Sequence, residues 1–114
     1  MALLEKTKEL YKRLPRDRDS IFKYSLQWNL LLKHDIFERV ARPWIGKKIR
    51  EYMGVDEPNV VQHIMKMLNA RPMAEKMREN VKSIMDEKTG EFVEKLWQTL
   101  IFEEMKVVEG LYTN

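Results

Sequence analysis

Apolar side chains recur at steps of three and four residues along most of this chain, which is the spacing of one face of an α-helix. The first such stripe consists of Leu3, Thr7, Leu10 and Leu14. It predicts a helix over 3–14 that ends at Pro15. The charged segment 16–19 is typical of a turn, and a short helical turn is expected over 20–24.

A longer stripe lies in the middle of the first half of the chain. Its members are Trp28, Leu31, Leu32, Ile36, Phe37 and Val40. They predict one helix over about 26–40. Because proline disfavours helical geometry in the residue before it, this helix is expected to end or kink at Arg42. Pro43 then suits the first turn of a second helix, and Gly54 suits the left-handed position that closes it.

Two further stripes predict a third and a fourth helix. The third is expected to start after Asp56, a good N-cap residue, with Pro58 in its first turn. Arg71 and Pro72 end it. The fourth is expected over 73–85, where the methionines recur at helical spacing. These methionines fit either core filling or an adaptable peptide groove, and core filling is the interpretation we favour.

The last predicted helix has the clearest pattern. Its apolar residues recur in pairs every four residues from Phe92 to Met105. Gly110 follows its end, and Leu111 is placed for the apolar contact of a Schellman cap. Together the stripes predict an all-α fold, a compact bundle of four to five helices with an extra N-terminal amphipathic helix.

The composition narrows the class of protein. The chain has 114 residues, of which 44% are hydrophobic and 34% charged, and this suits a single helical domain. It has no cysteine, which excludes a disulfide scaffold and a thiolate metal site. No apolar run approaches the roughly 20 residues that span a bilayer, and the N-terminus lacks the apolar stretch of a signal peptide. We therefore expect a soluble intracellular protein that binds no membrane.

The charge is distributed unevenly. Residues 1–50 hold 13 Lys and Arg against six Asp and Glu, whereas residues 51–114 hold eight against 12. An anionic partner for the first half explains this asymmetry, and so does attraction between the two halves of the chain.

Side chains that could support catalysis are few. His34 and His63 have no second histidine at ligand spacing, and the serines Ser20, Ser25 and Ser83 lack the context of a nucleophile. No glycine-rich phosphate loop is present. We therefore expect no enzyme activity, no metal, no cofactor and no small-molecule substrate.

Two tryptophan-containing segments carry a family resemblance. Residues 42–54 contain a Pro-Trp-Ile tripeptide followed by a helix with basic residues and a glycine, and the last predicted helix has its own tryptophan. Over 20–112 this arrangement resembles the PWI domain of pre-mRNA splicing factors, with 1–19 as a basic, helical N-terminal flank. The segment 22–28 is similar to one subgroup, splicing regulators that combine an RNA-recognition motif, an Arg/Glu-rich region and a C-terminal PWI domain. The chain would then be part of a longer protein.

The resemblance implies a nuclear module that binds single- and double-stranded nucleic acid, RNA and DNA as well, with little sequence preference. It also implies that basic residues flanking the domain take part in binding. An alternative from another class is a docking module that binds proteins of a splicing complex, for which the acidic second half and the methionine-rich helices would matter more.

The candidate phosphate-binding residues form two groups. The first group lies in the N-terminal flank, with one residue shortly after it: Lys6, Lys8, Lys12, Arg13, Arg16, Arg18 and Lys23. The second group lies in and before the Pro-Trp-Ile helix: Arg39, Arg42, Lys47, Lys48 and Arg50. Such cations bind phosphates by charge and counterion release. From spacing alone a solvated face with a Lys47–Glu51 pair is an equal alternative, and the resemblance favours phosphate contact.

Two structural questions stay open at this point. The N-terminal helix could pack on the bundle, order only on RNA, or serve as the partner helix of a dimer. The motif residues Pro43, Trp44 and Ile45, with Trp28 and Trp97, could stack on bases or anchor helix packing. We favour the packing role because large aromatic side chains contribute most when they are buried.

Overall fold

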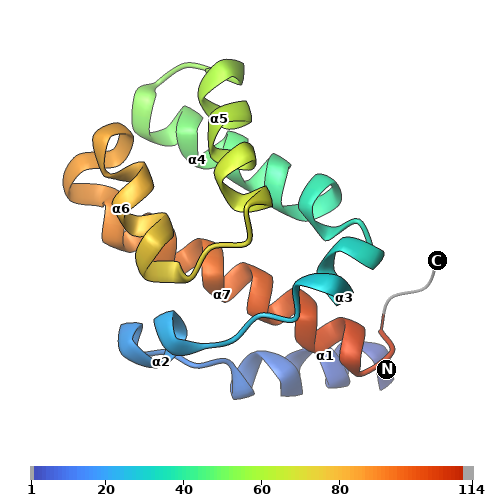
Figure 1. The fold of residues 1–114 in the computed structure, drawn as a ribbon. Helices are drawn as coiled ribbons and strands as arrows, with labels where there is room; N and C mark the ends of the chain where they lie inside the picture. The colour runs from blue at the N-terminus through green and yellow to red at the C-terminus, as the bar shows by residue number, and fades with distance from the viewer. Residues whose placement is uncertain (1, 112–114) are drawn as a thin grey trace.

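Helices make up nearly all of the regular structure in residues 2–111, the part of the chain that this computed structural model describes (Figure 1). The α-helices are α1 (Ala2–Arg13), α2 (Arg18–Lys23), α3 (Trp28–Lys33), α4 (Arg42–Met53), α5 (Pro58–Asn69), α6 (Ala74–Met85) and α7 (Thr89–Val108). A π-helical segment, Phe37–Ala41, leads into α4, and a 3₁₀ turn, Asp86–Lys88, leads into α7. The expected all-α bundle is confirmed, while the expected domain end at 112 lies just outside the described residues.

The long helix α7 is the centre of the bundle. It runs through the middle of Figure 1, and α1, α2, α3, α6 and the π-helical segment all contact it. Its apolar pairs are buried as expected, with Phe92 fully buried and Trp97 1% exposed. Its end is a Schellman cap: the Gly110 N–H donates to the Val107 carbonyl and the Leu111 N–H to the Lys106 carbonyl.

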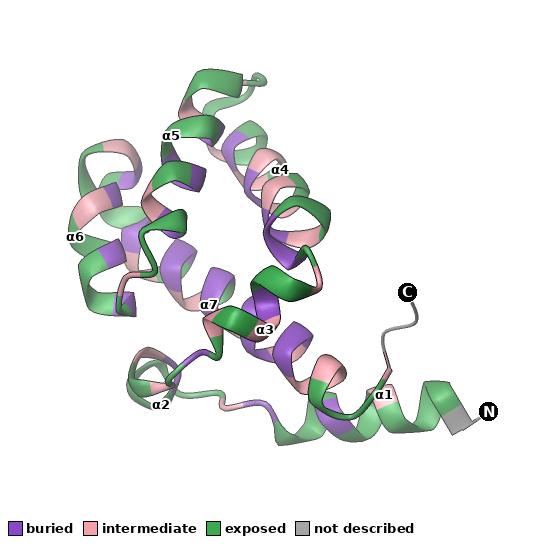
Figure 2. Cartoon of the chain, turned by 45° about the vertical axis from the view of Figure 1, so that its right-hand side comes forward, coloured by how far each residue is buried: buried purple, intermediate pink, exposed green. Residues whose placement is uncertain are grey.

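Helix α1 lies along the second half of α7 (Figure 2). Its stripe explains the contact, because Leu10 is 2% exposed and Leu14 is also buried. The ring of Tyr11 meets the α7 residue Phe102 edge to face, with 5.9 Å between centroids. The first turn of α1 is less covered, and Leu3 there is 61% exposed.

The predicted helix over 26–40 is wrong. The chain instead forms the short helix α3, turns at His34 and Asp35, and resumes helical geometry at Ile36. Asp35 has φ 57°, in the left-handed region, where a short polar side chain is tolerated better than most. Leu32, which linked the two halves of the apolar stripe in the sequence, is exposed.

The helix end expected at Arg42 is also wrong. Arg42 is in right-handed helical geometry, and the π-helical segment continues directly into α4 with Pro43 in its first turn. The Arg42 N–H donates to the Phe37 carbonyl, five residues back, which is the hydrogen bond of a π-turn. This wider turn brings the proline into the helix where its missing N–H is tolerated.

The predictions for the two ends of the connection between α4 and α5 had opposite outcomes. Gly54 closes α4 in the left-handed conformation, with φ 80°, so that prediction is confirmed. The predicted N-cap Asp56 is wrong, because Glu57 occupies that position without a side-chain capping bond. The Asp56 carboxylate instead lies 3.7 Å from the Arg50 guanidinium, which draws it back toward α4.

A buried carboxylate fixes the connection between α2 and α3. Glu104 of α7 is 2% exposed and accepts hydrogen bonds from the Tyr24 hydroxyl and from the backbone N–H of Gln27. Burial first, and the bond to Glu104 second, raise the pKa of Tyr24 well above its ordinary value. Because a buried carboxylate is stable only when its oxygens are satisfied, this contact holds the connecting segment against α7.

Candidate nucleic-acid interface

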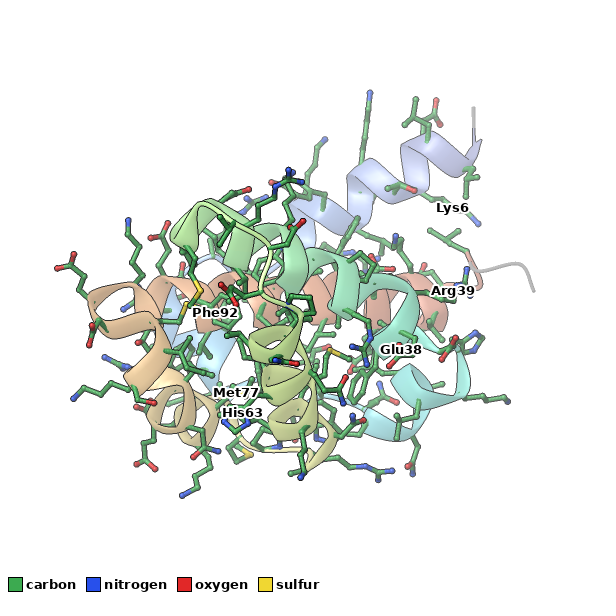
Figure 3. All side chains as sticks on the ribbon, turned by 90° about the horizontal axis from the view of Figure 1, so that it is seen from above. Lys6, Glu38, Arg39, His63, Met77 and Phe92 are labelled. Carbon is green, nitrogen blue, oxygen red and sulfur yellow. The ribbon has the colours of Figure 1, made fainter. Side chains whose placement is uncertain are left out.

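The basic residues of α1 divide between different sides of the helix. At about 100° per residue, Lys6 and Arg13 share one side, near Leu10, and Lys8 lies one turn from Tyr11 on the other side. Arg13 Nη2 lies 4.0 Å from Glu109 Oε1, so part of its charge is neutralised. Lys6 projects from the outer part of α1, as labelled in Figure 3.

Four of the predicted cations have no ion-pair or hydrogen-bond partner among residues 2–111. They are Lys6, Lys8 and Lys12 on α1, and Lys47 on α4. All four side chains are exposed. The Lys47–Glu51 pair that spacing allowed does not form, because Glu51 pairs with Lys48 at 3.3 Å instead.

The other basic residues of the Pro-Trp-Ile helix are engaged locally. Arg42 makes two hydrogen bonds to the Glu38 carboxylate, at 2.7 and 3.0 Å, and a third to the side-chain amide oxygen of Gln62. The hydrogen bonding from Arg42 lowers the pKa of the Glu38 carboxylate. Arg50 faces Asp56, as described above. Such exposed pairs contribute little stability.

Three more predicted residues are engaged by groups outside the Pro-Trp-Ile helix. Arg18 donates from Nε to Glu94 of α7 at 2.7 Å, which anchors the start of α2. Lys23 pairs with Asp19 on α2 at 3.0 Å. Arg39, labelled beside Glu38 in Figure 3, donates to the His34 carbonyl. The structure therefore does not gather all of the predicted cations into one patch.

A hollow of about 360 Å³ opens between α1, α4 and α7, and we call it the α1–α4 hollow. Its walls combine aromatic, cationic and polar side chains: Tyr11, Leu14, Arg16, Trp44, Lys48, Lys95, Gln98, Thr99 and Phe102. None of these side chains is acidic. The three cations belong to different segments. Lys95 and Phe102 come from α7, which was not among the segments predicted to bind phosphate.

Aromatic rings and cations are paired within the α1–α4 hollow. The Arg16 guanidinium lies 4.7 Å from the centre of the Tyr11 ring and also donates to the Tyr11 carbonyl. Lys48 Nζ lies 5.7 Å from the centre of the Trp44 ring. Gln98 donates to the Pro15 carbonyl at 3.0 Å, which fixes the end of α1 at the rim. These contacts hold the cations near apolar rings without neutralising them.

The motif residues have packing contacts as well. Ile45 is fully buried, and the half-buried Trp44 ring lies 5.6 Å from that of Phe92, at 36°. Trp28 meets Trp97 edge to face at 6.0 Å between centroids, and it also meets Phe37. Of the three tryptophans, Trp44 is the one that lines the α1–α4 hollow.

The methionines of the third and fourth predicted helices are largely core residues. Met65 and Met77 are fully buried and Met85 is 5% exposed, which agrees with core filling; Met73 is exposed. Among residues 2–111, no three His, Asp or Glu side chains are grouped to hold a metal ion, and no helix is long and apolar enough to cross a membrane.

Comparison with known proteins gives consistent matches. The sequence profile described as "PWI domain" matches residues 39–107, more than half of the chain. RNA-binding motif protein 25 of Arabidopsis thaliana is 38% identical over 104 residues, which is 91% of this chain and 12% of that protein. RNA-binding protein 25 of mouse and of human is 32% identical over 96 residues, 84% of this chain and 11% of each relative. The chain therefore spans a small part of the length of the curated relatives it matches.

Proposed function

Since the chain belongs to the PWI domain family, we propose that it is a nucleic-acid-binding, non-catalytic module of a nuclear pre-mRNA splicing factor. It binds RNA, and DNA as well, mainly through phosphates and with little sequence preference. The names of the relatives, which describe RNA-binding proteins, support this proposal. The module acts within a longer protein that also contacts proteins of the splicing complex.

The observation that carries the proposal is the open positive charge on α1 and α4, two of the helices that line the α1–α4 hollow. Lys8 and Lys12 on α1 and Lys47 on α4 are exposed and have no partner in the described residues. Acidic side chains are absent from the walls of the hollow. Phosphates are attracted to such a surface because binding releases counterions from the nucleic acid.

This mode of binding has a characteristic salt dependence. For single strands, the logarithm of the association constant falls with the logarithm of the salt concentration by roughly 0.7 for each phosphate neutralised. Lys8, Lys12 and Lys47, with the cations of the hollow, give roughly four to six such contacts. Affinity is then expected to fall roughly 50- to 300-fold between 50 and 200 mM salt.

Charge reversal at matched positions tests the proposal. The variant Lys8→Glu/Lys12→Glu/Lys47→Glu changes three exposed lysines beside the α1–α4 hollow. Its control, Lys66→Glu/Lys76→Glu/Lys82→Glu, changes three exposed lysines on α5 and α6 and alters the net charge equally. With fluorescence anisotropy of a labelled single-stranded RNA, the first variant should bind at least ten-fold more weakly than the control. Equal affinities of the two variants would contradict the proposal.

A protein-docking role is the second candidate, and one observation favours it. Three large apolar side chains are exposed where the start of α1 lies beside the end of α7: Leu3, Leu4 and Val108. An apolar surface of this kind suits a partner protein. If the chain is a docking module, reversing the charge of Lys8, Lys12 and Lys47 should leave binding of the partner protein intact. Leu3→Asp/Leu4→Asp should abolish that binding.

A further inference from the structure

We infer that a second surface, where the connection between α5 and α6 meets the start of α3, binds an acidic peptide segment of a partner protein (Figure 1). Its central residue is Arg71, whose Nη1 lies 3.3 Å from Asn29 Oδ1. The peptide that suits this surface has a carboxylate next to an apolar side chain. The inference goes beyond the proposed function, because the surface contains none of the predicted phosphate-binding residues.

Arg71 holds a backbone conformation that suits glycine. It follows α5 with φ 56°, whereas the residues with positive φ that follow α4 and α7 are Gly54, at 80°, and Gly110, at 72°. The other non-glycine residues with positive φ in 2–111 are Asp35 and Asp86, and short polar side chains tolerate this region better than long ones. An arginine here therefore costs free energy that a glycine would avoid.

The contacts of Arg71 within the chain do not explain that cost. Over the described residues its side chain makes one hydrogen bond, the one to Asn29, and no ion pair. Both side chains are exposed, so this bond contributes little stability. The guanidinium keeps most of its five N–H donors, in a planar fork that matches the two oxygens of a carboxylate. A carboxylate from another molecule is the ligand that this chemistry favours.

A hollow of about 390 Å³ lies beside the guanidinium, and we call it the Arg71 hollow. Its lining consists of Leu26, Gln27, Trp28, Asn29, Leu30 and Arg71. None of these side chains is acidic. Leu30 and Trp28 are half-buried and offer apolar area to a ligand, while the amides of Gln27 and Asn29 can hydrogen-bond to a peptide backbone.

Exposed apolar and cationic side chains extend this surface beyond the hollow. Met73, two residues after Arg71, is 61% exposed. On α3, Leu32 is also exposed, and Lys33 is exposed without an ion-pair partner in residues 2–111. At about 100° per residue, both lie on the side of α3 that carries Asn29. Apolar groups beside unpaired cations are complementary to a peptide that alternates carboxylates with apolar side chains.

The number of cations favours a peptide over nucleic acid here. The Arg71 hollow has one cation in its lining, whereas the α1–α4 hollow has Arg16, Lys48 and Lys95. Nucleic-acid affinity grows with the number of phosphates neutralised, while one guanidinium suffices for a carboxylate. Trp28 of the Arg71 hollow meets Trp97, which lies about 200° around α7 from Lys95. A peptide and a nucleic acid can therefore bind together, on opposite sides of α7.

The test removes the arginine by a change that the fold should tolerate. Arg71→Gly takes away the guanidinium and relieves the positive φ. Lys82→Gln is the control, since it removes one exposed cation from the far part of α6. The probe is a ten-residue peptide that alternates glutamate with leucine, compared with versions that carry lysine for glutamate or serine for leucine. Binding is measured from ¹H–¹⁵N correlation spectra of the labelled chain, and stability from urea unfolding.

The wild-type chain should bind the glutamate–leucine peptide, with the largest shift changes in α3 and at 71–73. Arg71→Gly should weaken binding roughly 10- to 150-fold, the usual loss for a hydrogen bond to a charged group, while its urea midpoint stays equal or rises. Lys82→Gln should stay within about two-fold of the wild type. A purely structural role of Arg71 predicts the opposite pattern, unchanged binding with a lowered urea midpoint.

Three other results would overturn the inference. They are no binding of the glutamate–leucine peptide by the wild-type chain at millimolar concentration, equal affinity for the lysine version, and equal affinity for the serine version. If a short single-stranded RNA, and not the peptide, shifts the signals of Arg71 and Met73 most, the occupant is nucleic acid and the inference is wrong. None of these variants changes Lys8, Lys12 or Lys47, so the proposed function stands or falls separately.

Discussion

Shortening Leu10 to alanine tests whether α1 is part of the folded body. Leu10 is 2% exposed and lies between α1 and α7, so Leu10→Ala removes buried methyl groups and leaves a space behind. Buried Leu→Ala changes destabilise proteins by about 2–5 kcal/mol. Because Leu10 also borders a surface hollow, where neighbours can partly collapse, we expect about 2–3 kcal/mol here.

Leu3→Ala is the matched control, since the same change is made on the same helix at a side chain that is 61% exposed. It should alter the free energy of unfolding by about 0.5 kcal/mol or less. In urea unfolding followed by circular dichroism, with a slope of about 1–3 kcal/mol per molar, Leu10→Ala should lower the midpoint by about 0.7–3 M. Equal midpoints for the two variants would mean that α1 is detached in solution, and the α1–α4 hollow would then lack one wall.

Two glycines of α4 and one tyrosine give the remaining predictions. Gly46→Ala should raise the free energy of unfolding by about 0.5–1 kcal/mol, because the added Cβ meets open space and alanine is the better helix former. Gly54→Ala should lower the free energy of unfolding by about 1 kcal/mol, because a φ of 80° is unfavourable for a residue with a Cβ. Thermal melts of the two variants check the two signs. The pKa of Tyr24 is raised above its ordinary 10.0 by burial and by Glu104, so the folded chain keeps a proton that the unfolded chain loses above pH 10. Stability from this group is present below pH 10 and lost as the pH rises further, so Tyr24→Phe should lose less stability than the wild type between about pH 9 and pH 11 in urea unfolding.

The helices of the second half could be predicted from the sequence because their apolar residues follow one period without interruption. Residues such as Ile64, Met77 and Leu96 are fully buried where the stripes placed them. Both glycine caps could be predicted as well, since Gly54 and Gly110 occupy positive φ for a local steric reason.

The break between α3 and the π-helical segment could not be predicted from periodicity. Leu32 and Ile36 are four residues apart and continue the stripe, yet Leu32 is exposed in the structure. The buried step is from Leu31 to Ile36, which is five residues and does not fit a regular α-helix. Farther along, the π-turn from Phe37 to Arg42 places Pro43 inside a continuous helix, where a local rule predicted an end.

The candidate interface could be predicted only in part. Spacing placed Lys47 and Lys48 on α4 beside Trp44, but it paired the wrong lysine with Glu51. Side-chain rotamers and the packing of the neighbouring helix decide which ion pairs form, and neither can be read from the sequence spacing. The contribution of α7 to the hollow, through Lys95 and Phe102, depends on tertiary packing between segments about 80 residues apart in the sequence.

The central claim is that nucleic acid binds at the face where α1, α4 and α7 meet. The most direct measurement is a series of ¹H–¹⁵N correlation spectra of the backbone amides during titration with a short single-stranded RNA. The largest shift changes are expected in the second half of α1, in the turns of α4 around Trp44 and Lys48, and around Lys95 on α7. Changes concentrated on α5 and α6, or at the apolar end formed by Leu3 and Val108, would contradict the claim.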